Sequence, residues 1–228
     1  MSVHYASRVR TAAILPVKSF SRAKQRLGDA LGSGDREQLA AAMVADMLSA
    51  LAAVEAIDDV VMVTAEPLAA RAAGRAGAVV VDDPDEAGQS AAAVRGIDAA
   101  LERGADRTLL VPGDCPAADP RELAQLLGRG AGPPSVVIVP DRHGAGTNAL
   151  LLSPPGVVAP SFGSGSFARH AARSRAAGAT VQAFELPSLA LDVDTPDDLA
   201  ALRAALERRP AGAPLTREVL DRLVHATV

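Results

Sequence analysis

Short apolar runs alternate along the chain with longer segments in which apolar residues recur at helical spacing. The runs are continuous rather than alternating, which is typical of strands buried on both faces. Strands are predicted at 11–17, 60–64, 78–83, 107–114, 135–141, 148–153, 180–186 and 189–193. Helices are predicted at 36–54, 67–74, 89–103, 166–177, 196–207 and 216–225, and one more begins at 120. This order predicts an α/β fold with a mostly parallel central sheet, helices on both faces, and antiparallel additions among the later strands.

Polar residues mark the expected beginnings of several helices. Asp35, Asp119 and Ser166 are the predicted N-caps, with Pro120 at the first position of its helix. The 228 residues fit one large domain, and 49% of them are hydrophobic. We expect a single domain over 1–228, with a core at about 11–208. The helical tail at 211–228 is expected to pack on its own domain or on a partner.

The composition limits which classes of partner and which cellular compartment are expected for this protein. With a net charge of −4 and 2% aromatic residues, the chain offers no broad basic field, so nucleic acid is not an expected partner. The single Cys115 excludes an intramolecular disulfide and is expected to be a packing residue in a reducing compartment. No signal peptide is recognisable, and no apolar run reaches the ~18 residues that cross a bilayer. We expect a cytoplasmic protein without a membrane partner, and a homodimer is possible.

Charged side chains follow four of the predicted strands. Lys18, Asp83, Asp114 and Asp141 each come just after an apolar run. In open α/β sheets, ligands bind at the carboxyl ends of the strands. The sequence therefore predicts a ligand site at this edge of the sheet.

The segment after the first strand is basic. In "PVKSFSRAKQRL" at 16–27, Lys18, Arg22, Lys24 and Arg26 lie close together. A triphosphate needs cationic donors and backbone amides, and neither a Walker loop nor a G-x-G-x-x-G motif is present here. The segment is a candidate phosphate site, and the alternative is a solvated loop with ordinary surface charge.

Three carboxylates form a candidate metal site. Asp114 stands at a sharp strand exit after Gly113, and Asp192 and Asp194 lie two residues apart at the end of a predicted strand. Residues two apart on a strand point to the same side, so these two carboxylates repel each other unless a positive group separates them. A divalent cation such as Mg²⁺, which prefers oxygen ligands, is the obvious candidate. The alternative is an acidic loop before a capped helix.

Small and polar residues mark further candidate contacts. Thr147 and Asn148 follow a Gly-rich loop and offer hydrogen bonds to a small acid. The loop "SFGSG" at 161–165 opens a helix, whose first amides suit phosphate or carboxylate, and His170 in its first turn is either ligand-facing or structural. The junction Gly88-Gln89-Ser90 can contact a nucleotide base, although it is a weak signal alone.

Five segments together resemble the guanylyltransferase family of deazaflavin coenzyme F-420 biosynthesis, known as CofC or FbiD. They are "PVKSFSRAKQRL", "VPGDCP", "DRHGAGTNALLL", "FGSGSFARH" and "LDVDTPDDL", in the family's order over roughly 12–200. The resemblance implies a single-domain nucleotidyltransferase fold of the GT-A/Rossmann-like type. It also implies GMP transfer from GTP, with Mg²⁺, to the phosphate of phosphoenolpyruvate, 2-phospho-L-lactate or 3-phosphoglycerate, with release of pyrophosphate.

The resemblance also implies roles for individual residues. The catalytic residues that bind the GTP phosphates are Lys18, Lys24 and Arg26, and the metal ligands are Asp114, Asp192 and Asp194. Asp114 is also catalytic and nucleotide-binding, and the nucleotide-binding residues include Gly88 and Ser90. The acceptor-binding residues are Thr147, Gly163 and Ser166. Many members have Gly-Leu-Asn where this chain has Gly88-Gln89-Ser90. Of the properties that the resemblance implies, guanine selectivity is therefore the one that this sequence supports least.

Two other classes of function remain open at this point. The motif Asp192-Val-Asp194 also fits a metal-dependent glycosyltransferase that uses a nucleotide sugar. The basic segment and the scarcity of aromatic residues, which often form sugar-binding faces, argue against it. A non-catalytic nucleotide-binding protein is the third reading.

Overall fold

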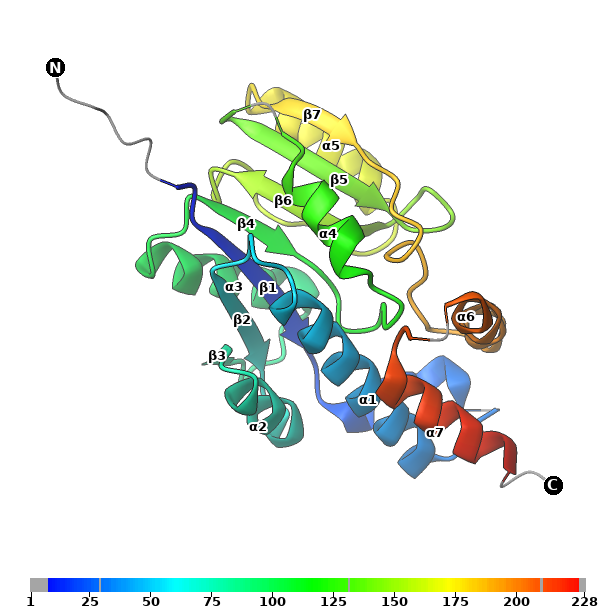
Figure 1. Cartoon of the computed structure of the whole chain (residues 1–228). Coiled ribbons are helices and arrows are strands. Elements are labelled where there is room, and N and C mark those ends of the chain that lie inside the picture. The colour runs from blue at the N-terminus through cyan, green and yellow to red at the C-terminus, as the bar shows by residue number, and fades with distance from the viewer. Residues whose placement is uncertain (1–7, 29, 131, 210, 226–228) are drawn as a thin grey trace, which may run out of the picture.

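The computed structural model describes residues 8–28, 30–130, 132–209 and 211–225. Within these residues, seven strands form one sheet in the order β3-β2-β1-β4-β6-β5-β7 (Figure 1). The strands are β1 (Thr11–Val17), β2 (Asp59–Thr64), β3 (Val79–Asp82), β4 (Arg107–Leu110), β5 (Ser135–Pro140), β6 (Thr147–Ser153) and β7 (Thr180–Ala183). Strand β6 is antiparallel to its neighbours β4 and β5, whereas the other pairs are parallel. The predicted α/β fold with a mostly parallel sheet is confirmed.

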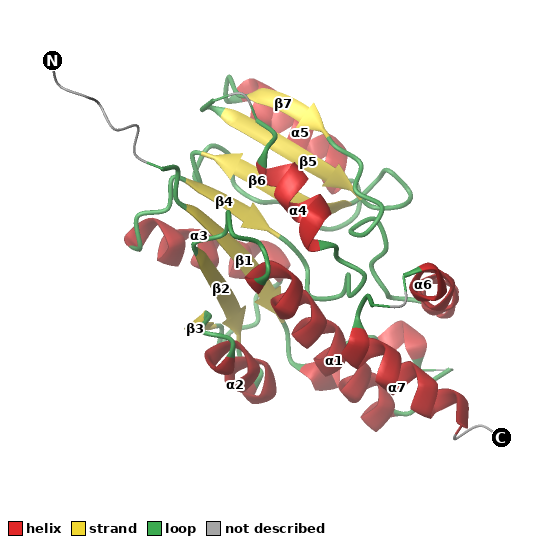
Figure 2. Ribbon diagram, viewed as in Figure 1, coloured by secondary structure: helices red, strands yellow, loops and turns green. Residues whose placement is uncertain are grey.

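Helices cover both faces of this sheet (Figure 2). The buried residues of α1 (Ser33–Ala52), α2 (Pro67–Arg75) and α4 (Pro120–Leu127) pack on one face. Those of α3 (Gln89–Glu102) and α5 (Ser166–Ala176) pack on the other. A third apolar cluster joins α1 to α6 (Pro196–Arg208) and α7 (Pro214–His225). Two short 3-10 helices, η1 (Phe20–Arg22) and η2 (Gln25–Leu27), follow β1.

Two of the three predicted helix caps are wrong. Helix α1 begins earlier than expected, with Gly32 as its N-cap, and Asp35 lies in its first turn, where a carboxylate complements the helix dipole. Helix α5 is preceded by Gly165 in the left-handed conformation, φ 68°, and Ser166 is already helical. Asp119 is confirmed, because its side chain accepts a hydrogen bond from the amide two residues on.

The predicted strand at 189–193 is absent. A turn occupies 187–189, and the chain then makes isolated backbone bonds, from the Arg142 amide to Ala190 and from the Val193 amide to Asp114. Both partners lie in the loops that follow β5 and β4, so these bonds do not form a ladder with a strand. The segment therefore crosses the carboxyl ends of the strands as an extended loop.

The C-terminal tail packs on its own domain. In α7, the amides of Leu215 and Thr216 donate to the Asp46 carboxylate on α1, at 3.2 and 2.7 Å. Val219 and Leu220 are buried in the cluster that α7 shares with α1 and α6. Residues 226–228 of the predicted tail lie outside the described residues.

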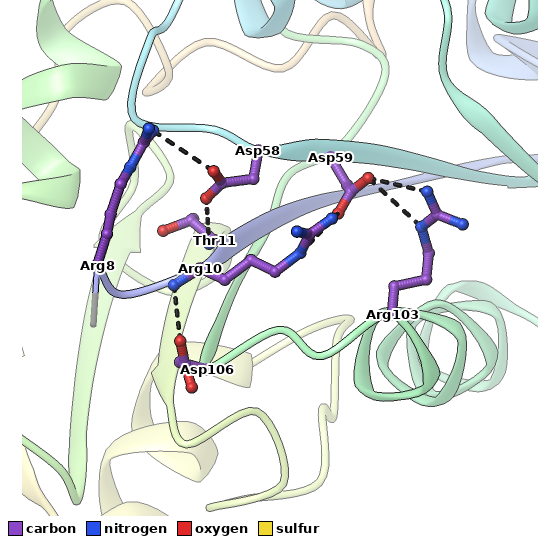
Figure 3. A network of polar contacts seen from close by, with 7 residues as sticks. All are labelled: Arg8, Arg10, Thr11, Asp58, Asp59, Arg103 and Asp106. Atoms are coloured by element: carbon purple, nitrogen blue, oxygen red, sulfur yellow. Dashed lines mark hydrogen bonds and ion pairs between the residues drawn. The ribbon is translucent and has the colours of Figure 1, made fainter.

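A polar network ties down the amino ends of the first strands (Figure 3). Arg10 and Arg103 both hold the Asp59 carboxylate, at 2.6 and 3.1 Å. The Thr11 amide donates to Asp58, and the Arg10 amide donates to Asp106. Burial raises the pKa of Asp59, but the hydrogen bonds from the two arginines outweigh it and lower that pKa. This network lies at the end of β1 opposite to Lys18, so it stabilises the sheet away from the predicted site.

Across the described ranges, the helices are all too short or too polar to cross a membrane.

Candidate active site

A cavity of about 770 Å³ opens at the carboxyl ends of the parallel strands. The four residues predicted from strand ends, Lys18, Asp83, Asp114 and Asp141, all line it. The convergence expected from strand topology is therefore present. Cationic, carboxylate and hydroxyl side chains line the same cavity.

Ten of the residues implied by the family resemblance line this cavity. They are Lys18, Lys24, Arg26, Gly88, Asp114, Thr147, Gly163, Ser166, Asp192 and Asp194. Ser90 is not among the lining residues that the structure describes. Its hydroxyl accepts a hydrogen bond of 2.9 Å from the Phe162 amide, so it holds the loop at 161–165 instead of facing the cavity.

Lys24 is the buried cation of the site. Its side chain is 6% exposed, and its Nζ lies 2.7 Å from Asp114 Oδ2 and 3.0 Å from Asp194 Oδ1. Burial lowers the pKa of Lys24, but the two carboxylates outweigh it and raise that pKa, so the side chain is an ammonium ion. Its backbone is left-handed, φ 54°, which turns the chain between η1 and η2.

The carboxylates of the site have unequal surroundings. Asp114 Oδ1 is buried and has no hydrogen-bond partner among the described residues. Burial, and then the charge of Asp114, raise the pKa of Asp192, although Asn148 donates to it at 3.2 Å. Within the described ranges, no three acidic, histidine or cysteine side chains close around one metal position. The positive group that separates Asp114 from Asp194 here is the Lys24 ammonium.

The basic segment is held in place by two glutamates that sequence reasoning missed. Glu86 accepts from the Ser19 amide at 2.7 Å and pairs with Arg22 at 3.1 Å. Glu66 accepts from the Phe20 amide at 3.0 Å. Both glutamates come shortly after predicted strands, and this position at a strand end is the sequence signal by which they could have been predicted. With Arg22 paired to Glu86, the exposed Lys18 and Arg26 are left to face a ligand.

The opposite wall carries a chain of buried hydrogen bonds. The Ser161 amide donates to His170 Nε2 at 2.8 Å, and His170 Nδ1 lies 3.0 Å from Thr147 Oγ1. Ser166 Oγ in turn lies 3.2 Å from Thr147 Oγ1. Burial, and then the charges of Arg169 and Arg173, lower the pKa of His170 to about 4. The imidazole is fully buried and is not among the described residues that line the cavity, so of the two alternatives for His170 the structural one holds.

Cys115 is a packing residue, as predicted. It is fully buried, and its thiol lies 3.5 Å from the Leu189 carbonyl oxygen. Burial, and then Asp114, raise the pKa of the thiol, which removes it as a nucleophile.

Comparison with known proteins agrees with this geometry. Residues 11–205 match the family model described as guanylyl transferase CofC like. A phosphoenolpyruvate guanylyltransferase from Conexibacter woesei is 51% identical over 215 residues, covering 94% of this chain and 96% of that protein.

Solved structures show the same fold at lower identity. A protein described as a nucleotide-diphospho-sugar transferase from Desulfovibrio desulfuricans G20 superposes with a TM-score of 0.70 at 20% identity, over 95% of this chain and 97% of that one. A nucleotidyl transferase from Methanothermobacter thermautotroptrophicus gives 0.62 at 21%, over 87% and 98%. These likenesses confirm the predicted nucleotidyltransferase fold.

Proposed function

The chain belongs to the family of CofC-like guanylyl transferases, and from that premise we propose that it transfers GMP from GTP to the phosphate of phosphoenolpyruvate. Pyrophosphate is released, and the product serves the biosynthesis of deazaflavin coenzyme F-420. The observation that carries the proposal is that exposed cations, carboxylates and hydroxyl groups line one and the same cavity. 2-Phospho-L-lactate and 3-phosphoglycerate are the alternative acceptors.

The chemistry needs positioning more than proton transfer. An oxygen of the acceptor phosphate attacks the α-phosphorus of GTP, and the bond from that phosphorus to the β-phosphate oxygen breaks. The attacking oxygen is already anionic, so no strong general base is required. Lys18 and Arg26 offset the charge of the triphosphate and of the leaving pyrophosphate, because both are exposed at the cavity.

A divalent cation, Mg²⁺ by our proposal, fits the donor set of the acidic wall. Asp114, Asp192 and Asp194 line this wall and would supply oxygen ligands once their side chains turn toward one position, which they do not share in the described structure. Two features mark an unmet demand for positive charge: Asp114 Oδ1 has no hydrogen-bond partner among the described residues, and the pKa of Asp192 is raised. When bound, such a cation neutralises phosphate charge and polarises the phosphoryl group. Lys24 pairs with two of these carboxylates, and a cation bound there would leave its ammonium group free to pair with a phosphate.

The acceptor lies by our proposal at the opposite wall. Thr147, Gly163 and Ser166 face the same cavity as the cations, and Gly163 has φ 102°, which keeps its side of the wall free of a side chain. Gly88 lines the cavity at the start of α3, and we propose that the guanine base binds there. A glycosyltransferase is not favoured, because the similar curated protein is a guanylyltransferase.

The test is a pyrophosphate-release assay with purified protein, Mg²⁺ and GTP. Separate reactions contain phosphoenolpyruvate, 2-phospho-L-lactate and 3-phosphoglycerate, and the set is repeated with ATP and CTP. Release with GTP and one acid supports the proposal and identifies the acceptor. Silence in every reaction from a folded protein contradicts it, as does release of a nucleoside diphosphate without pyrophosphate.

Asp114→Asn provides the matching variant. Turnover is expected to fall by at least 100-fold while the protein stays folded, since the amide keeps the shape of the side chain and removes its charge. The control is Asp98→Asn, the same change at an exposed position of α3 away from the cavity. Near-normal turnover of the Asp114 variant contradicts the role.

A further inference from the structure

The hydrogen-bond chain behind the acceptor wall has a fixed direction. It begins at the Ser161 amide, which can only donate, so His170 Nε2 must be the acceptor at 2.8 Å. A neutral imidazole carries one proton, which is then on Nδ1. Nδ1–H therefore donates to Thr147 Oγ1 at 3.0 Å.

The neighbouring hydroxyls complete the chain. Thr147 and Ser166 carry two hydroxyl protons between them, and one of these is used in the 3.2 Å contact that joins their oxygens. Whichever of the two hydroxyls donates in that contact, the proton of the other hydroxyl has no acceptor within this series of hydrogen bonds. Because both residues line the cavity, this proton is available to an acceptor atom of a ligand there.

We propose that His170 is a positioning residue. Its Nδ1–H donates to Thr147, and the Thr147–Ser166 hydroxyl pair therefore donates its remaining proton to an anionic group of the acceptor acid. The inference rests on the proposed function. An ionised carboxylate or phosphate accepts hydrogen bonds and donates none, so it is the complementary group for a cavity wall whose hydroxyl donates. Without the Nδ1–H donor, Thr147 can turn its own proton toward the imidazole, and the wall loses its donor.

Packing holds the imidazole in the orientation that this role requires. The Phe162 ring meets it edge-on, with centroids 5.3 Å apart and planes at 75°. The Phe162 amide is itself held by Ser90, and Arg169 donates to the Ser161 carbonyl oxygen at 3.0 Å. The loop at 161–165 and the imidazole are therefore positioned together.

Two amide substitutions separate the two ring nitrogens. In His170→Asn, the amide nitrogen lies near the place of Nδ1 and retains a donor toward Thr147. In His170→Gln, the amide oxygen reaches the place of Nε2 and accepts from Ser161, but the donor toward Thr147 is lost. Both variants are checked for folding by thermal unfolding.

The measurement is the split between kcat and KM with phosphoenolpyruvate as the varied substrate. We expect His170→Gln to raise the KM for this acid by about 10-fold or more, with the KM for GTP changed less than threefold, as for a lost hydrogen bond to a charged group. His170→Asn is expected to recover at least fivefold of that loss. In the Thr147→Val background, His170→Gln is expected to add less than twofold.

Equal KM values for the two His170 variants in an active, folded protein overturn the inference and leave the proposed function standing. Wild-type protein that releases no pyrophosphate with any of the acids overturns the proposed function instead. The ¹⁵N chemical shifts of the His170 ring test the chain without any turnover. A pyrrole-like Nδ1 and a pyridine-like Nε2 support it, and the opposite tautomer or a doubly protonated ring at pH 7 overturns it.

Discussion

Lys24→Met removes the ammonium ion that lies between Asp114 and Asp194 and keeps most of the side-chain volume. The two carboxylates, 28% and 46% exposed, then face each other and Asp192 without a counter-ion from the protein. We expect this change to lower the free energy of unfolding and to raise the affinity of the site for a divalent cation.

The magnitude follows from the geometry. At an effective dielectric constant of about 20, charges 2.7 and 3.0 Å apart attract by about 6 and 5.5 kcal/mol. Desolvation of a side chain that is only 6% exposed offsets much of this attraction. Removing one partner of a fully buried pair costs about 3–5 kcal/mol, whereas an exposed pair contributes about 0–1. With partly exposed carboxylates, we expect a loss of about 2–3 kcal/mol, or roughly 5–10 °C in Tm for a chain of this size.

Urea and thermal unfolding at pH 7, each with and without about 5–10 mM Mg²⁺, measure both effects, because a cation that binds only the folded protein raises its stability. The control is Lys18→Met, which removes the same charge from an exposed side chain of the same cavity and is expected to change stability by less than about 0.5 kcal/mol. Mg²⁺ is expected to raise the Tm of the Lys24 variant more than that of the wild type. Equal stability of the two variants, or an equal Mg²⁺ effect on variant and wild type, refutes the reasoning.

Three further predictions concern the scaffold. Gly96→Ala places a Cβ against a methyl carbon of Ile14 and is expected to lower stability in urea by about 1–3 kcal/mol. Gly74→Ala, with nothing within 4 Å of its Cβ, is expected to be neutral or to stabilise by up to about 1 kcal/mol, and equal effects of the two changes contradict this packing. The folded-state pKa of Asp59 is lowered, so its contribution is present above the unfolded value of about 4 and is lost as the pH falls below it; Asp59→Asn is therefore expected to flatten the fall in Tm between about pH 6 and 3, and an unchanged profile contradicts this. Thr195→Ala removes the hydroxyl of the capping box of α6 and is expected to cost about 1 kcal/mol in chemical unfolding, and no loss argues against a stabilising cap.

The local parts of the fold were predictable because they depend on near neighbours in the chain. Continuous apolar runs identified seven strands, and β1, β5 and β6 are buried along nearly their whole length, as a strand covered on both faces requires. The segment at 189–193 has the same pattern and is not a strand, because its backbone bonds go to the loops after β4 and β5, and pairing between distant segments is not a local property. The insertion of β6 between β4 and β5 is likewise decided by pairing between distant segments.

The candidate site divides in the same way. The positions of Lys18, Asp83, Asp114 and Asp141 after strands were enough to expect one cavity, because parallel strands end at a common edge. The alternation that places Asp192 and Asp194 on one side holds in an extended loop as it does in a strand. Which positive group separates the carboxylates was not predictable, because the left-handed turn at Lys24 brings Nζ between residues that are 90 and 170 positions away in the chain.

By itself, the sequence determined the α/β alternation, the edge of the sheet at which the cavity opens, and most of the polar residues that line it. Each of these follows from residue type and short-range spacing. The tertiary structure alone decided that Lys24 takes the place between two carboxylates, that Ser90 holds a loop, and that His170 sets the direction of a hydrogen-bond chain. A hydrogen bond depends on distance and angle to within fractions of an ångström, and those are set only when the packed core fixes its elements relative to one another.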